Sequence, residues 1–168
     1  MARRARAAEN PVTFEHITPA ALREAVRIYL EEAYPDGAVP AEVRRRLEWP
    51  EAASLAELVQ GGPFERIPPD AAMENCEHIG IRLGNRRYPH MKLGVDRIPQ
   101  TDDWVLAVEC HDRDVVAEIP QEERGAFEAL FRRNAALKAR IERRWTEAGL
   151  PTFERYVRER LSRRRGGT

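Results

Sequence analysis

The chain has 168 residues, of which 42% are apolar and 33% are charged, and its 28 basic and 28 acidic residues leave no net charge at pH 7. This length and composition predict a single domain over residues 1–168, with loose ends at about 1–12 and 163–168, and they exclude a chain that is disordered by composition. The balanced charge provides no global field that would attract nucleic acid or an anionic membrane.

The cysteine content indicates the cellular compartment, and the charge distribution indicates which classes of partner the chain could bind. The two cysteines, the lack of a secretory leader and the lack of an apolar run near 18 residues indicate a cytoplasmic protein with free thiols and no membrane partner. Residues 127–168 carry twelve basic and five acidic residues, so this end could bind an anionic partner or an acidic region of a second copy in a homo-oligomer. Glutamates interleaved with these arginines argue against a nucleic-acid-binding stripe.

The first third of the chain carries three helix signals. Thr18 followed by Pro19 is typical of a helix start, because a hydroxyl caps the first turn and proline fits the first helical position. Ser54 and Glu57 have the spacing of a capping box. The sequence therefore predicts helices between Thr18 and Tyr34, between Pro40 and Trp49, and between Ser54 and Gly61. Residues 61–72, punctuated by prolines, are predicted to form a loop.

The middle of the chain has the alternating pattern of half-buried strands. Apolar side chains recur at every second residue in three runs, which are Ile79 to Leu83, Met91 to Val95 and Trp104 to Cys110. A fourth strand is predicted at Val115 to Ile119. Polar alternates in the first two runs predict an antiparallel sheet with one face packed on the core and the other at least partly open.

In the last third of the chain, the apolar residues again have the spacing of a helix. Apolar residues from Phe127 to Ala148 lie on one face of a long helix, Gly149 fits its C-terminal cap, and a final helix is predicted to begin near Thr152. The fold class that follows is α+β: a small antiparallel sheet of three to four strands (about 78–119), flanked by N-terminal and C-terminal helices.

The register of the sheet decides which polar side chains meet. A first turn centred on Arg86 places Arg82 opposite His90. A second turn centred between Gln100 and Thr101 places His90 opposite His111. The same register pairs Lys92 with Glu109. A tight turn after His111 pairs His111 with Asp114. These pairings predict a polar strip across the sheet, because directly opposed side chains are neighbours.

A non-catalytic ligand-binding or protein-interaction module is the function that this strip favours. Arginine, lysine and titrating histidines suit a small anionic ligand or a protein partner, and no cofactor is required. The residues expected to bind are Arg82, Asn85, Arg87, Tyr88, His90, Lys92 and His111. The simplest alternative is that these side chains form ordinary cross-strand pairs on a solvent-exposed sheet face and bind no ligand.

A small metal-dependent enzyme, hydrolase-like in its chemistry, is the second hypothesis. His90 and His111, with Asp112 or Asp114, could bind Zn²⁺ or another divalent metal, and His111 beside an aspartate could also act as an acid–base pair. A third hypothesis is assembly or nucleic-acid contact through the basic C-terminal helices. The chain contains no phosphate loop, G-x-S-x-G, H-E-x-x-H or dinucleotide motif.

Cys76 and His78 are additional candidate metal ligands, together with His90 and His111. In the register above, His78 faces Gly94 and lies roughly 13 Å from His90, which is too far for one ion. A disulfide between Cys76 and Cys110 is disfavoured by the reducing compartment. Cys110 alternates with core residues and is expected to be a small apolar side chain.

Overall fold

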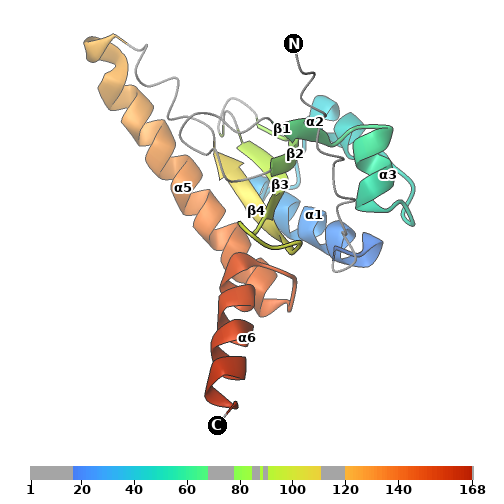
Figure 1. The fold of residues 1–168 in the computed structure, drawn as a ribbon. Coiled ribbons are helices and arrows are strands. Elements are labelled where there is room, and N and C mark those ends of the chain that lie inside the picture. Colours follow the sequence, from blue (N-terminus) through green and yellow to red (C-terminus); the bar gives the residue numbers. More distant parts are fainter. Residues whose placement is uncertain (1–16, 68–77, 85–87, 89–90, 111–119, 168) are drawn as a thin grey trace, which may run out of the picture.

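The fold is given by a computed structural model, which describes residues 17–67, 78–84, 88, 91–110 and 120–167 (Figure 1). The elements in chain order are α1 (Pro19–Ala33), α2 (Ala41–Arg46), α3 (Leu55–Gln60), β1 (Glu65–Ile67), β2 (His78–Arg82), β3 (Met91–Arg97), β4 (Trp104–Cys110), the short 3₁₀ turn η1 (Gln121–Glu123), α5 (Arg124–Glu147) and α6 (Phe153–Arg165). The predicted α+β class is confirmed, since helices flank a four-stranded antiparallel sheet of order β1-β2-β3-β4.

The predicted helix starts are also confirmed by their caps. The Thr18 hydroxyl accepts a hydrogen bond from the amide of Ala21 at 3.1 Å. The Ser54 hydroxyl accepts from the amide of Glu57 at 3.2 Å, and the Glu57 carboxylate accepts from the amide of Ser54 at 2.8 Å. These bonds satisfy amides that have no partner within the helix, which is why the sequence signals located the starts correctly.

The sheet register agrees with the prediction in one hairpin and differs in the other. Lys92 pairs with Glu109, as a turn centred between Gln100 and Thr101 requires. The predicted pairing of Arg82 with His90 is wrong, because Arg82 pairs with Lys92. This shift of two residues keeps every side chain on its predicted face, so the apolar alternation alone could not detect it.

The first edge strand was not anticipated. Glu65–Ile67 lies inside the predicted loop 61–72 but pairs antiparallel with the start of β2. Three residues are too few to show an alternating pattern, so this strand is defined by its neighbour rather than by its own sequence. The predicted fourth strand at Val115 to Ile119 lies outside the described residues.

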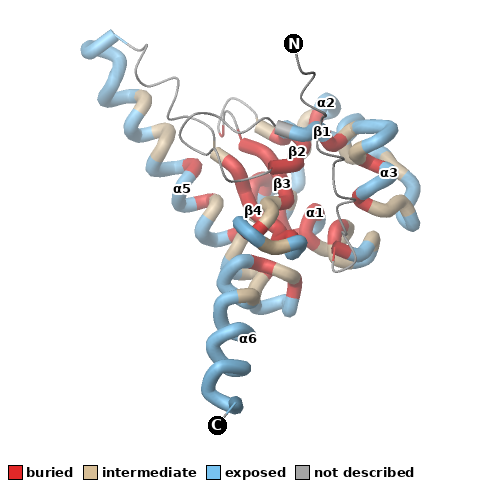
Figure 2. Tube along the Cα trace, in the orientation of Figure 1, coloured by how far each residue is buried: buried red, intermediate tan, exposed pale blue. Residues whose placement is uncertain are grey.

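The hydrophobic core lies between one face of the sheet and the helices α1, α3 and α5 (Figures 1 and 2). Trp104 and Trp145 are fully buried there, and the indole N–H of Trp145 donates to the carbonyl of Ala25 at 3.0 Å. On the solvent side of the same contact, Arg144 pairs with Glu31 at 2.7 Å and with Glu32 at 3.1 Å. Helix α5 is thereby attached to α1 as well as to the sheet.

The outer edge of β4 is covered by α5 and by the chain that follows it. Lys138 donates to the carbonyl of Val108 at 2.6 Å, and Glu142 accepts from the Val108 amide at 3.0 Å. The Leu106 amide donates to the carbonyl of Pro151 at 2.8 Å. The unpaired backbone groups of an exposed edge strand can pair with a strand of another chain. These contacts occupy such groups on β4 and so hinder that pairing.

The last helix projects away from the sheet. No residue of α6 is buried, and Figure 2 shows the helix exposed along its length. The helix continues through Arg165. Within the described part of the chain, no helix combines the length and apolar character needed to cross a membrane.

Candidate metal centre

Three adjacent strands place a histidine and two carboxylates on the polar face of the sheet. His78 begins β2 and pairs directly with Asp96 near the end of β3. Glu109 lies near the end of β4, opposite Lys92. Because side chains alternate along a strand, all three point to the face opposite the core. We call His78, Asp96 and Glu109 the His–Asp–Glu cluster.

The three side chains of the cluster touch one another. The His78 Nδ1 atom lies 2.7 Å from Asp96 Oδ1 and 3.3 Å from Glu109 Oε1. One ligand atom from each residue can be chosen so that all three lie within 4.8 Å of one another. Nitrogen and oxygen atoms thus converge from three strands on one small volume.

A glycine between them makes this convergence possible. Asp96 and Glu109 stand at different levels of the sheet, and Gly94, which pairs with Gly80 and Ala107, lies at the level between them. A Cβ atom at Gly94 would stand 3.2 Å from the Cγ of Glu109 and 3.0 Å from the Ile79 carbonyl. The Glu109 side chain therefore lies over a position that only glycine leaves open.

The cluster is largely withdrawn from solvent. The side chains of His78, Glu109 and Asp96 are 2%, 11% and 23% exposed, respectively. Lys92 is buried as well, whereas Arg82 at the end of β2 is exposed. Among the described residues, the face that the sequence predicts to be at least partly open is exposed at Arg82 and partly exposed at Asp96, whereas its centre is buried.

Burial and mutual contact shift the protonation of all three groups. Hydrogen bonds to Asp96 and then to Glu109 raise the pKa of the His78 imidazole to about 10. Burial raises the pKa of the Asp96 carboxyl to about 7. Burial acts in the same direction on Glu109, but hydrogen bonds with His78 and Asp96 outweigh it and hold the pKa of Glu109 well below its usual range. At neutral pH the cluster therefore contains an imidazolium, a carboxylate and a carboxyl group near its titration midpoint.

A cavity of about 340 Å³ opens beside the cluster and is lined by Asp96. Its other walls come from the start of β4, from Lys138 and Glu142 of α5, and from the beginning of α6. Volumes of about 300–1,000 Å³ are typical of small-molecule sites. Asp96 is therefore the member of the cluster through which a ligand in this cavity would reach the other two.

The residues predicted from sequence to bind a ligand fall into two groups. Asn85, Arg87, His90, His111, Asp112 and Asp114 lie outside the described residues. Of the others, Lys92 is buried opposite Glu109, and Tyr88 is 5% exposed and belongs to the hydrophobic core. The backbone carbonyl of Arg82 accepts a hydrogen bond from Arg46 at 2.7 Å.

Sequence reasoning considered His78 but missed both of its partners. The predicted register placed His78 opposite Gly94, whereas His78 pairs with Asp96. One signal could have found the cluster: His78, Asp96 and Glu109 share the face on which Gly80, Gly94 and Ala107 leave room for longer side chains. A comparison with known proteins adds no assignment, since no family model, curated protein or solved structure matches the chain.

Proposed function

We propose that this protein binds a divalent transition-metal ion, such as Zn²⁺ or Mn²⁺, through His78, Asp96 and Glu109. The observation that carries the proposal is the convergence of one ring nitrogen and two carboxylate groups, from three neighbouring strands, within 4.8 Å. Imidazole nitrogen combined with carboxylate oxygen is a donor set that suits these ions. A sheet also holds ligands more rigidly than loops do.

The spacing of the atoms supports the same proposal. Metal–ligand distances of roughly 2.0–2.2 Å imply neighbouring ligand atoms about 3.0–3.4 Å apart. The two contacts of His78 Nδ1, at 2.7 Å and 3.3 Å, lie within about 0.3 Å of this range. The ion would replace the protons that now hold the cluster together, so its affinity should rise with pH.

The adjoining cavity suggests what a bound ion would do. Because Asp96 lines the cavity, a coordination position next to Asp96 would face it. A divalent ion there would polarise a ligand or activate a water molecule, as in metal-assisted hydrolysis. The binding role that the sequence predicted for the polar face is thus retained in the proposal, but its centre moves from His90 and His111 to His78.

Titration calorimetry with Zn²⁺, Mn²⁺ and Mg²⁺ tests the proposal. The wild-type protein should bind one equivalent of Zn²⁺ or Mn²⁺, and the variants His78→Gln, Asp96→Asn and Glu109→Gln should each bind at least roughly tenfold more weakly. Asp102→Asn is the matched control, because Asp102 is a mostly exposed acid outside the cluster. Absence of binding, or equal binding by all four variants, would contradict the proposal.

Metal-free acid–base chemistry is a second candidate, favoured by one observation. Asp96 lines the cavity and burial raises its pKa to about 7, which suits a group that exchanges protons near neutral pH. The two candidates differ in how they respond to a chelator. If Asp96 acts alone, ligand binding in the cavity should persist in EDTA and follow the titration of Asp96.

A further inference from the structure

A second, larger cavity lies between α6 and the turn that joins β3 to β4. Its volume is about 540 Å³, and it does not include the His–Asp–Glu cluster. One wall is formed by Thr101 and the first residues of β4, and the other by α6. Helix α6 projects from the body of the protein (Figure 1), and the cavity is a cleft beside this helix.

The wall formed by α6 is rich in arginine. Arg155, Arg160 and Arg163 line the cleft, together with the acids Asp103 and Glu159. The sequence of α6 as a whole contains six arginines and two glutamates, so the helix is strongly cationic. Some of these charged side chains form hydrogen bonds or ion pairs within the protein.

The two acids of the cleft have partners. Glu159 accepts a hydrogen bond from the Nε of Arg155 at 2.8 Å, and Arg155 also donates to the carbonyl of Gly149. Asp103 accepts from the hydroxyl of Tyr156 at 3.2 Å. These bonds attach the start of α6 to the preceding turn and to the turn before β4. Glu159 is paired with Arg155, whereas Asp103 keeps its negative charge because its hydroxyl donor is neutral, so the five charged residues of the cleft carry a net charge of +1.

Arg160 and Arg163 are the charges that remain. The guanidinium of Arg160 lies 5.8 Å from the centre of the Tyr156 ring, and its Nη1 donates to the Tyr156 hydroxyl at 3.0 Å. Arg163 follows three residues later, so the two side chains are neighbours on one side of the helix. Within the described ranges, neither arginine forms an ion pair. Tyr156 holds the first guanidinium in place and leaves most of its donors available.

We infer that this cleft binds a small phosphorylated molecule through Arg160 and Arg163. Guanidinium groups match phosphate oxygens with paired hydrogen bonds, and two of them suit a ligand with at least two negative charges. The volume of about 540 Å³ exceeds what a single phosphate needs and falls in the range for a nucleotide-sized ligand. The inference does not rest on the metal centre.

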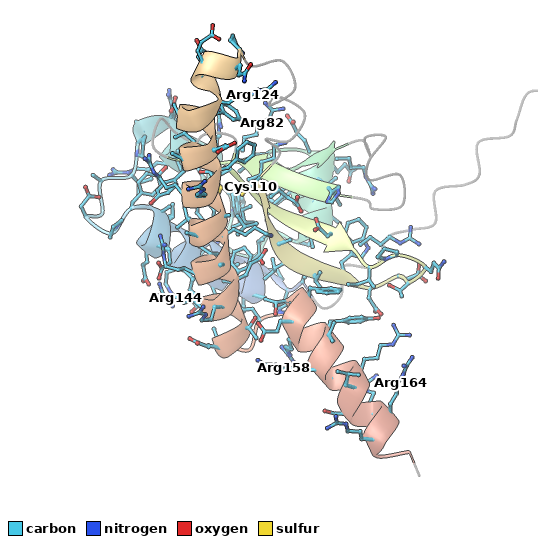
Figure 3. All side chains as sticks on the ribbon, turned by 90° about the vertical axis from the view of Figure 1, so that its left-hand side faces the viewer. Arg82, Cys110, Arg124, Arg144, Arg158 and Arg164 are labelled. Atoms are coloured by element: carbon cyan, nitrogen blue, oxygen red, sulfur yellow. The ribbon has the colours of Figure 1, made fainter. Side chains whose placement is uncertain are left out.

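Calorimetry in EDTA tests the inference, since the chelator removes any contribution from metal. The probes are pyrophosphate, ATP, adenosine and a DNA oligonucleotide, and the variant is Arg160→Gln/Arg163→Gln. The matched control is Arg164→Gln/Arg165→Gln, which removes the same charge from the same helix at residues outside the cleft lining (Arg164 is labelled in Figure 3). Circular dichroism confirms that both variants retain the fold.

The expected result is that ATP and pyrophosphate bind and adenosine does not. The Arg160/Arg163 variant should bind ATP at least roughly tenfold more weakly, because it loses charge-assisted hydrogen bonds, while the control should stay within about twofold. No binding of either phosphate compound would overturn the inference. Equal weakening in both variants would also overturn it, as would tight binding of a DNA oligonucleotide that both variants weaken alike, since that pattern indicates a general cationic surface.

Discussion

The protonated state of His78 predicts a specific dependence of stability on pH. Its pKa is about 10 in the folded protein and 6.5 in the unfolded chain, so the folded state binds an extra proton between these values. The stabilisation is fully present below pH 6.5 and is lost as the pH rises through 10. Each pH unit in this window changes the free energy of unfolding by up to about 1.4 kcal/mol. Between pH 7 and pH 9 the protein should therefore lose roughly 2–3 kcal/mol, a large share of a typical stability of roughly 5–15 kcal/mol.

The appropriate comparison is a variant without titrating groups in the cluster. Replacing His78 alone would leave two buried carboxyl groups that titrate together, so His78→Gln, Asp96→Asn and Glu109→Gln are combined in one chain. Urea unfolding at pH 7, 8 and 9 in EDTA and constant salt, followed by tryptophan fluorescence, gives the free energy of unfolding of the wild-type protein and of the triple variant. Trp104 and Trp145 are fully buried and should report the loss of the core.

The difference between the two proteins is the decisive quantity. Ionisation of tyrosine, lysine and cysteine elsewhere affects both chains and cancels. The wild-type protein should lose roughly 2–3 kcal/mol more than the triple variant between pH 7 and pH 9, because the folded state binds protons more tightly at His78 and, to a smaller extent, at Asp96. Parallel curves, with a difference that changes by less than about 0.5 kcal/mol, would refute the argument that two carboxylates hold a proton on His78.

Three further predictions concern the contacts that hold the sheet and the helices in place, and urea unfolding checks each of them. Gly94→Ala should destabilise the protein by roughly 1–3 kcal/mol through overpacking, whereas Gly125→Ala, whose Cβ would meet nothing within 4 Å, should stabilise α5 slightly; similar effects at both sites would contradict the close approach at Gly94. Lys138→Met should cost roughly 1–3 kcal/mol because the Val108 carbonyl loses its donor, and an unchanged midpoint would mean that water replaces that contact. Ser54→Ala should cost about 1 kcal/mol, and no loss would show that the capping box is dispensable.

The helices could be predicted from the sequence because their boundaries are local. Thr18, Ser54 and Thr152 each cap a helix with their own side chain, so a few neighbouring residues define the start. Gly149 has a positive φ of 76°, and it ends the long helix before Pro151 as expected. Such signals act within one or two turns and require no knowledge of the tertiary fold.

The sheet could be predicted only in part because pairing is non-local. The register assumed for the turn between β3 and β4 agrees with the observed pairing of Lys92 with Glu109. The connection between β2 and β3 is longer, and apolar alternation specifies the face of each residue but not a shift by two. That shift decides whether His78 faces Gly94 or Asp96. The candidate site was missed for this reason, although its residue types and their shared face were visible.

Crystallographic anomalous scattering from protein soaked in Zn²⁺ or Mn²⁺ tests the central claim most directly. One strong peak is expected at roughly 2.0–2.2 Å from His78 Nδ1 and from a carboxylate oxygen of both Asp96 and Glu109. A density map without a peak among these three side chains, or with metal bound only elsewhere, would contradict it.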